Sequence, residues 1–129
     1  MIISYSHERF PALIKAGIKI HTIRKRGRWK AGMKMHHWMY SPRNPSKNPY
    51  FFLENVCTGT QPIFISAFFK EVFIETDKAI GKLSEVGREL DWREIAINDG
   101  FNENPDLLWK WFTESSHDME IVHWTQKRY

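Results

Sequence analysis

Residues 17–24 read Gly-Ile-Lys-Ile-His-Thr-Ile-Arg, and this short stretch decides how the rest of the chain is interpreted. Its β-branched residues, in partial alternation with polar ones, predict a strand. Side chains on a strand point alternately to its two faces. Lys19 and His21 are therefore expected on one face, and Thr22 and Arg24 on the other.

A helix is expected directly before this stretch, over residues 7–16. Ser6 has the side chain of an N-cap, and Pro11 falls in the first turn, where proline is tolerated. Gly17 suits the position that follows a helix, because it adopts the left-handed conformation without strain. The chain is thus predicted to turn from helix to strand at this glycine.

Further strands and helices are expected along the chain. Alternation and β-branched content predict strands over 18–24, 33–40, 51–57, 62–75 and 120–125. A capping box at Asp91 predicts a helix from about residue 92, and Asn104-Pro105 opens another over 105–114. This order predicts an α+β fold with a curved sheet and helices to one side.

Composition is typical of a globular protein with a single domain, here residues 1–129. Hydrophobic residues make up 42% of the chain and charged residues 26%, which allows a core without disulfides or metal. No apolar run is long enough for a membrane span, and the first residues lack the pattern of a secretion signal. The single cysteine, Cys57, is expected to be buried, with a reactive thiol as the alternative. These features favour a cytoplasmic protein.

Charge is unevenly distributed along the sequence. The net charge is +4, yet residues 1–50 carry eleven Lys and Arg against one acid. Residues 51–129 carry eight Lys and Arg against fourteen acids. A basic half of this strength favours an anionic partner, nucleic acid or nucleotide first. The alternative is that the two halves interdigitate in the fold and their charges mix on the surface.

The stretch 17–24 also holds the densest group of side chains with useful chemistry. A cation on a rigid strand, such as Lys19 or Arg24, can hold a phosphate or polarise a carbonyl. The hydroxyl of Thr22 can donate, accept or, once activated, attack. The alternative interpretation is a solvated basic strand edge, which resists pairing with other strands.

The same residues carry a family resemblance. The spacing Gly-x-Lys-x-x-Thr-x-Arg over 17–24, preceded by Phe10 and Ile14, resembles the opening signature of the ASCH domain. The segments Arg-Trp-Lys-Ala-Gly at 28–32 and Ala-Ile-Asn-Asp-Gly-Phe at 96–101 resemble two later elements of that family. The resemblance implies a PUA-like, partly open β-barrel with flanking helices, and a link to RNA.

Small bacterial members of the ASCH family hydrolyse N4-acetylcytidine with a Lys, a Thr and a Glu. Lys19 and Thr22 match the first two by spacing, and Asp99 stands where the resemblance places the acid, one methylene shorter. The resemblance therefore implies that Lys19, Thr22 and Asp99 are catalytic, and that the partner is RNA or a modified nucleoside.

Chemical roles for these residues follow from the needs of amide hydrolysis. Thr22 is the expected nucleophile, and Lys19 activates it if burial lowers the lysine pKa. Asp99 orients the amide or shuttles the proton to the leaving amine. Arg24 stabilises a developing oxyanion or binds a phosphate.

An RNA- or nucleotide-binding module without catalysis is the alternative function. Basic side chains supply salt-dependent phosphate contacts, and aromatic faces stack on unpaired bases. The residues expected to bind substrate or RNA are Arg24, Arg28, Trp29, Trp38, Tyr40 and Arg43. Packing in the core is the alternative interpretation of Trp29 and Trp38. The proline-rich loop over 41–49 is expected to cover part of the cleft.

No metal ion or cofactor is expected. His36 and His37 would point to opposite faces of a strand, and the other histidines show no ligand spacing. The sequence has no P-loop and no dinucleotide fingerprint. Acid–base chemistry by His21 and His37 in RNA cleavage is a third interpretation. The aromatic cluster at 109–112 is expected to pack in the core.

Overall fold

The computed structural model describes residues 1–75 and 87–129 and confirms an α+β fold. The strands form two sheets, which do not join into a closed barrel in these described ranges. The first sheet has the order β1-β3-β4, with β1 parallel to β3 and β4 antiparallel to it. Its strands are β1 (Ile2–Tyr5), β3 (Lys34–Met39) and β4 (Tyr50–Val56).

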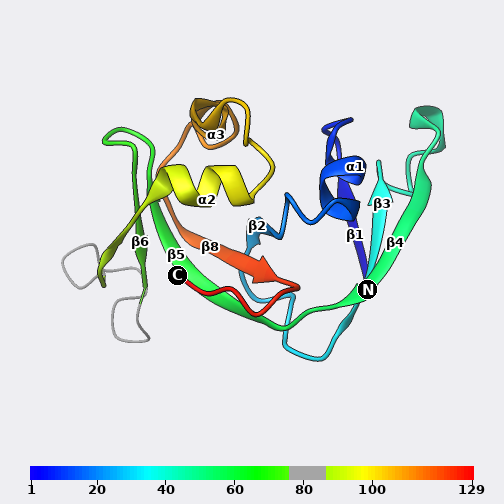
Figure 1. Cartoon of the computed structure of the whole chain (residues 1–129), viewed down its shortest axis with the longest axis horizontal. Coiled ribbons are helices and arrows are strands. Elements are labelled where there is room, and N and C mark those ends of the chain that lie inside the picture. Colours follow the sequence, from blue (N-terminus) through cyan, green and yellow to red (C-terminus); the bar gives the residue numbers. More distant parts are fainter. Residues whose placement is uncertain (76–86) are drawn as a thin grey trace.

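The second sheet is antiparallel and has the order β2-β8-β5-β6-β7. Its strands are β2 (His21–Lys25), β5 (Gly59–Ser66), β6 (Glu71–Ile74), β7 (Glu89–Leu90) and β8 (Ser116–His123). Only Cys57 and Thr58 separate β4 from β5, so one long ribbon runs along the bottom of the molecule and joins the two sheets (Figure 1). Cys57 is a buried free thiol at this junction, which confirms its predicted burial.

The helices are short and lie above the β4–β5 ribbon in Figure 1. They are α1 (Phe10–Lys15), α2 (Trp92–Asn98) and α3 (Leu108–Trp111), with 3₁₀ turns η1 (Pro45–Lys47) and η3 (Pro105–Leu107). The predicted cap of α2 is confirmed, because the Asp91 carboxylate accepts from the backbone N–H groups of Arg93 and Glu94 at 3.0 and 3.3 Å. None of the helices in the described ranges is long and apolar enough to cross a membrane.

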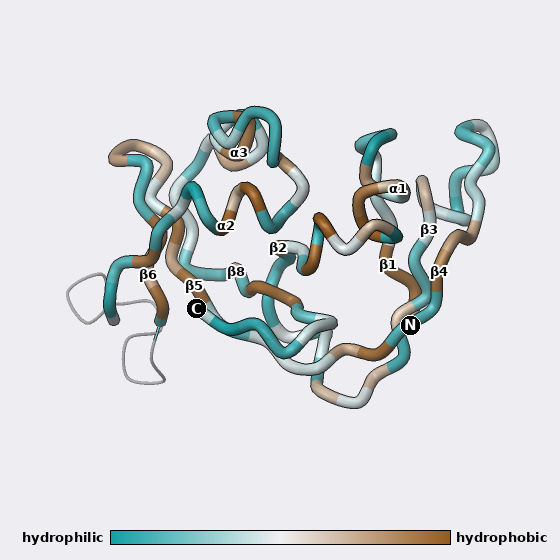
Figure 2. Tube along the Cα trace, viewed as in Figure 1, coloured by the Kyte–Doolittle hydropathy of each residue, from teal (hydrophilic) through white to brown (hydrophobic). Residues whose placement is uncertain are grey.

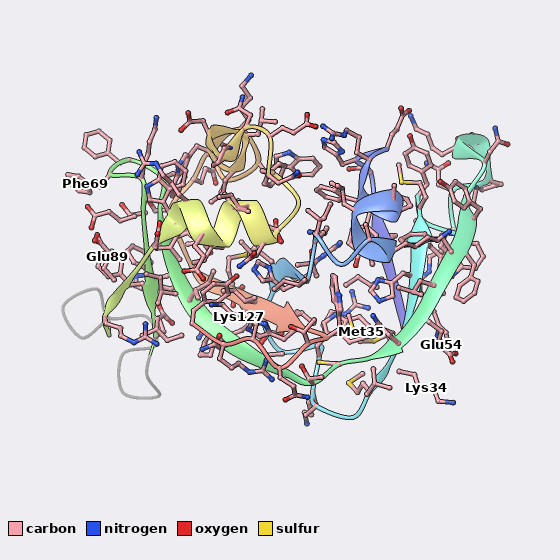
Figure 3. The ribbon with its side chains drawn as sticks, viewed as in Figure 1. Lys34, Met35, Glu54, Phe69, Glu89 and Lys127 are labelled. Carbon is pink, nitrogen blue, oxygen red and sulfur yellow. The ribbon has the colours of Figure 1, made fainter. Side chains whose placement is uncertain are left out.

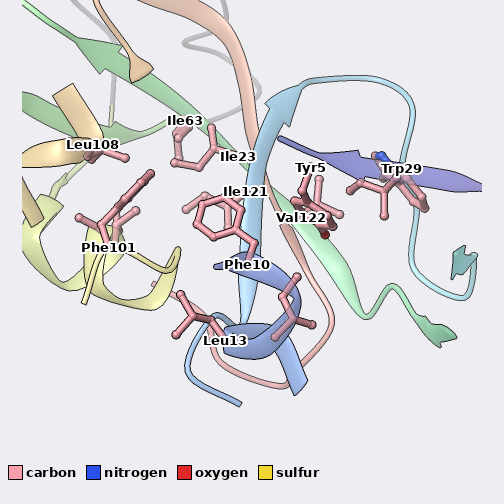
Figure 4. Packing of buried hydrophobic residues seen from close by; sticks show 14 of the residues in the cluster. Tyr5, Phe10, Leu13, Ile23, Trp29, Ile63, Phe101, Leu108, Ile121 and Val122 are labelled. Atoms are coloured by element: carbon pink, nitrogen blue, oxygen red, sulfur yellow. The ribbon is translucent and has the colours of Figure 1, made fainter. Parts of the chain in front are cut away.

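Both sheets contribute to a common apolar core. On β3 the predicted alternation is confirmed: Met35 and Met39 are buried, whereas Lys34 points outward (Figure 3). The buried cluster extends from Trp29 at one side to Leu108 at the other (Figure 4). In Figure 2, brown marks hydrophobic segments on β1 and β8.

The apolar run over 62–75 is two strands rather than the single strand predicted. β5 and β6 pair antiparallel around a turn at 67–70, in which Lys70 takes a φ of 54°. Phe68 and Phe69 in this turn are as apolar as the strand residues, yet they are 85% and 69% exposed. β-propensity alone therefore does not detect the turn.

The helix predictions are too long. The first helix begins at Phe10 rather than at residue 7, and Arg9, not Ser6, holds the cap position, with no side-chain hydrogen bond. The helix predicted over 105–114 is a 3₁₀ turn followed by one turn of α-helix. The sequence also does not predict β1 and β7, whose four and two residues are too few to show alternation.

Candidate functional site

A cavity of about 220 Å³, called the central cavity below, lies between β1, α1, β2 and the segments that follow α2 and α3. Its polar lining residues are Ser4, Ser6, Lys19, Thr22, Arg24 and Asp99. Its other lining residues are Tyr5, Phe10, Ile23, Phe101, Trp111 and Phe112. The fold thus brings together all three residues predicted to be catalytic, together with Arg24.

Lys19 reaches the central cavity from a turn rather than from a strand. Gly17 takes a φ of 74° and ends the first helical segment, as predicted. The Lys19 backbone N–H then donates to the Leu13 carbonyl at 3.1 Å. β2 begins only at His21, so strict alternation does not extend back to the lysine. For this reason Lys19 and Thr22 both line the cavity, as the sequence predicts for a cleft with Lys19, Thr22 and Arg24 on one wall, whereas strict alternation through residue 19 would place them on opposite faces.

Lys19 and Asp99 form a buried pair. Lys19 Nζ donates to the Asp99 backbone oxygen at 2.6 Å and to Asp99 Oδ1 at 3.0 Å. Burial lowers the pKa of Lys19 to about 8, although Asp99 opposes this shift. Burial acts to raise the pKa of Asp99, but Lys19 and His21 outweigh it and hold that pKa below its ordinary value. The pair therefore places a carboxylate against an amine that deprotonates readily.

A glycine turn positions this carboxylate. Gly100 takes a φ of 104°, and a Cβ atom there would lie 2.8 Å from Phe10 Cε1. Glycine is therefore required both for the backbone conformation and for the close approach of the Phe10 ring to this turn. The Ile20 N–H donates to the Asn98 carbonyl at 2.9 Å, which ties the end of α2 to the start of β2. Asp99 follows directly.

Arg24 connects the central cavity with the first sheet. Its Nε donates to Thr22 Oγ1 at 3.2 Å, and its Nη2 donates to the Ser4 carbonyl at 2.7 Å. Burial lowers the pKa of Arg24, yet a guanidinium remains charged in proteins. Thr22 keeps its own O–H free to donate. Among the described residues, no hydrogen bond joins Thr22 to Lys19.

A chain of buried hydrogen bonds supports Asp99 from outside the cavity. His21 Nδ1 lies 3.2 Å from Asp99 Oδ1, and His21 Nε2 lies 2.6 Å from the Tyr129 hydroxyl. Asn98 Nδ2 donates to the same hydroxyl at 2.9 Å. Burial lowers the pKa of His21 in spite of Asp99, so the ring is neutral at pH 7. Its Nδ1–H then donates to the carboxylate, and the Tyr129 O–H donates to Nε2.

His37 supports the Tyr5 side of the cavity in a similar way. Its Nε2 lies 2.7 Å from Asn55 Oδ1, and its Nδ1 lies 2.9 Å from the Tyr5 hydroxyl. Burial lowers the pKa of His37 and raises the pKa of Tyr5. His36 lies instead 2.8 Å from the Glu54 carboxylate. Within residues 1–75 and 87–129, no three His, Cys, Asp or Glu side chains gather as metal ligands.

Aromatic rings form the remaining wall of the central cavity. Phe10 and Phe101 pack edge to face with ring centres 5.8 Å apart, and Trp111 lies over Phe10 at 6.4 Å. Trp111 is 49% exposed, so the prediction that residues 109–112 pack in the core is wrong for this side chain. A cavity with rings on one side and charges on the other suits a flat, partly polar ligand such as a nucleobase.

The other predicted binding residues lie outside the central cavity. Trp29 packs in the core at 6% exposure, at the wall of one of the two neighbouring cavities. Trp38 and Tyr40 are half-buried and line neither the central cavity nor its two neighbours. Arg28 and Arg43 line a smaller neighbouring cavity. The loop that carries Arg43 does not line the central cavity, contrary to the prediction that it covers the cleft.

Several site residues were not predicted from the sequence. Ser4 and Tyr5 come from β1, whose only signal is the spacing of two buried side chains, Ile3 and Tyr5. Tyr129 reaches His21 across 108 positions. No local pattern predicts a contact of this kind.

Comparisons with known proteins give no match. No protein-family model matches the chain, and no match is found among curated proteins or solved structures. The ASCH resemblance therefore stays a prediction that rests on the residues quoted for it.

Proposed function

We propose that the protein hydrolyses the amide of an N-acylated nucleoside, N4-acetylcytidine or a related compound, in the central cavity. The pairing of Lys19 with Asp99 beside Thr22 and Arg24 carries this proposal. Amide hydrolysis needs a nucleophile, a base and a group that stabilises developing charge, and these residues supply all three. The proposal includes the ASCH resemblance and its PUA-like fold, with which two sheets that do not close are compatible.

Lys19 is the general base in this proposal. A neutral lysine has two N–H donors and one lone pair, and Asp99 accepts from both donors. The lone pair is then left to take the proton of Thr22. With a pKa of about 8, roughly a tenth of the lysine is neutral at pH 7, far more than for an exposed lysine.

The reaction balances through Lys19 and Thr22 alone, with water as the second substrate. Thr22 Oγ bonds to the acyl carbon while its proton moves to Lys19 Nζ. The C–N bond then breaks, and Lys19 gives that proton to the leaving nitrogen, which frees the amino group of the base. Water attacks the acyl-threonine ester and passes a proton to Lys19. Thr22 takes this proton back as the ester bond breaks and the acid leaves.

Asp99 and Arg24 have supporting roles. The lowered pKa of Asp99 keeps its carboxylate ionised, so it accepts a hydrogen bond from the amide N–H and orients the substrate rather than shuttling a proton. Its backbone oxygen also contacts Lys19, which compensates for a side chain one methylene shorter than glutamate. Arg24, held by the Ser4 carbonyl, stabilises the oxyanion of the tetrahedral intermediate.

The decisive experiment is a chromatographic assay of the purified protein with N4-acetylcytidine and a panel of other N-acylated nucleosides. Thr22→Ser keeps a hydroxyl, whereas Thr22→Val keeps the shape and removes it. We expect product with the wild type, reduced product with Thr22→Ser, and a loss of turnover of at least about 10³-fold with Thr22→Val, because the nucleophile is gone. Full activity in Thr22→Val, or no turnover of any panel member by the wild type, contradicts the proposal.

A second candidate is a binding module for RNA without catalysis, favoured by the exposed Arg28 and Arg43 beside the cavity. Such a module loses affinity steeply with salt and tolerates the loss of the Thr22 hydroxyl. Titration of fluorescent single-stranded RNA at several salt concentrations, with wild type and Thr22→Val, separates the two candidates. Tight, salt-sensitive binding without turnover supports the module.

A further inference from the structure

Two smaller cavities adjoin the central cavity on the side of β1, and together they are called the basic groove below. Their volumes are about 210 and 150 Å³. The lining residues that matter here are Ile2, Ser4, Arg24, Lys25, Arg28 and Arg43. Ser4 and Arg24 also line the central cavity, and Ser4 and Arg28 are shared by both parts of the groove. The central cavity and the two parts of the basic groove therefore adjoin one another through these shared lining residues.

The basic groove has an uncompensated positive charge. No Asp or Glu lines either part of it. Lys25 approaches Asp118 at 3.5 Å, but Arg24, Arg28 and Arg43 form no ion pair with the acids in the described ranges. By contrast, Arg9 pairs with Glu103 and Arg26 pairs with Glu75. Arginines left without acids around a hollow are typical of sites for an anionic ligand.

Arg24 is fixed before any ligand arrives. Its Nη2 is bonded to the Ser4 carbonyl and its Nε to Thr22, and its guanidinium centre lies 5.1 Å from the centre of the Tyr5 ring. It therefore stands as a rigid cation in the wall between the central cavity and the basic groove. An anion in the groove and a reacting group in the cavity would contact the same side chain from two sides.

We propose that the basic groove binds a phosphate attached to the nucleoside whose base occupies the central cavity. This inference rests on the proposed function and narrows its substrate class from a free nucleoside to a nucleoside phosphate. Arg24 and Arg28 bind the phosphate oxygens, and Arg43 contacts it from the loop. The phosphate is either the terminal monoester of a nucleotide or a diester within a nucleic-acid strand. A nucleic-acid strand would make more phosphate contacts than a single nucleotide.

The test is calorimetric titration of the full chain at low salt with cytidine, its 5′- and 3′-monophosphates and the dinucleotide CpC. We expect at least one phosphate-bearing ligand to bind about tenfold or more tightly than cytidine, because hydrogen bonds between charged groups are strong. Arg28→Gln and Arg43→Gln should each weaken the binding of the phosphate-bearing ligand more than that of cytidine, and so reduce this ratio. Lys30→Gln and Lys47→Gln, exposed cations that line neither part of the groove, are the matched controls.

Equal affinities for cytidine and all of its phosphates overturn the proposal, as do equal losses in the arginine and lysine variants. A preference for a monophosphate over CpC assigns the site to a nucleotide, and the reverse assigns it to a strand. Turnover of the acylated nucleoside is measured on the same samples. Phosphate discrimination without turnover contradicts only the hydrolase, and turnover without phosphate discrimination contradicts only the phosphate site.

Discussion

At Lys19, burial and pairing act in opposite directions on one amine. Desolvation favours its neutral form, and the Asp99 carboxylate favours the ammonium; the balance is a pKa of about 8. Lys19 and Asp99 are both buried and both line the central cavity, so a ligand that enters there lies against the pair. The protonation of Lys19 is therefore set by its burial together with its contact with Asp99.

We predict that kcat/KM for the acylated nucleoside rises with pH and reaches half of its plateau near pH 8, as Lys19 loses its proton. Lys19→Arg should remove turnover although it keeps the cation, because arginine stays protonated. Lys15→Arg, exposed at the end of α1, is the matched control and should keep the wild-type profile. Initial rates over the neutral to alkaline range measure this. A profile that is flat through pH 8 would exclude Lys19 as the base.

Among single residues, the sequence predicts the polar side of the site better than its aromatic side. The spacing from Lys19 to Thr22 and Arg24 is local, so their common position follows from one turn and one strand. The position of Asp99 follows from the family resemblance rather than from local spacing. Trp29, a predicted stacker, lies in the core, while Trp111, a predicted core residue, lines the cavity. Indole rings suit both places equally, so only the tertiary packing distinguishes them.

At the scale of the helices and strands, the turn after α2 positions the Asp99 carboxylate against Lys19. We predict that Gly100→Ala destabilises the fold by about 1 to 3 kcal/mol more than Gly27→Ala, because overpacking adds to the backbone strain. Both glycines have a φ of 104°, but a Cβ at Gly27 meets nothing within 4 Å, whereas one at Gly100 would meet Phe10. Urea unfolding of both variants measures the difference.

The turnover rates of Gly100→Ala and Gly27→Ala provide a second measurement of the same difference. Gly100→Ala should also lower kcat under conditions where it is fully folded, because the Asp99 carboxylate is displaced from Lys19. Gly27→Ala should keep the wild-type kcat. Equal unfolding free energies for the two variants would show that the Phe10 ring moves aside at no cost in stability. The contact with Phe10 would then not explain why residue 100 is glycine.

Helices and strands that are specified by neighbouring residues are predicted well from the sequence, whereas those that depend on pairing with a distant strand are not. The start of α2 at Asp91 is confirmed because a cap uses only the next three residues. The run over 62–75 contains no glycine, and its only proline is at one end, so its reversal comes from the pairing of β5 with β6. The strand β1 exists because it pairs with β3, more than thirty positions away. Such pairings have no local signature.

At the scale of the whole molecule, the uneven charge along the sequence is partly neutralised in space. Arg9 pairs with Glu103 at 2.7 Å, and Arg26 with Glu75 at 2.6 Å, so the basic first half does interdigitate with the acidic second half. Seven of the eleven Lys and Arg in residues 1–50 form no ion pair with an acid in the described ranges, and three of these seven, Arg24, Arg28 and Arg43, line the basic groove. The prediction of an anionic partner then depends on these seven cations. Net charge alone would have overestimated the surface available to such a partner.

Buried histidines connect the stability of the whole molecule to pH. His21, His37 and His123 are each fully buried, and burial lowers the pKa of each below the ordinary 6.5, in His123 to about 3. The unfolded chain therefore binds protons near pH 6.5 that the folded chain does not accept until lower pH. Stability should rise with pH through this window and fall as the solution is acidified from pH 7.

His123→Gln isolates one of these groups. The His123 ring donates from Nε2 to Gln61 Oε1 at 2.9 Å, and a glutamine amide can keep that hydrogen bond without titrating. We predict that below pH 6.5 this variant's unfolding free energy falls less steeply than the wild type's, by up to about 1.4 kcal/mol per pH unit, the contribution of one proton. Urea unfolding across the acidic range measures both slopes. Parallel slopes for His123→Gln and wild type would mean that His123 is protonated in the fold, against the desolvation that its burial imposes.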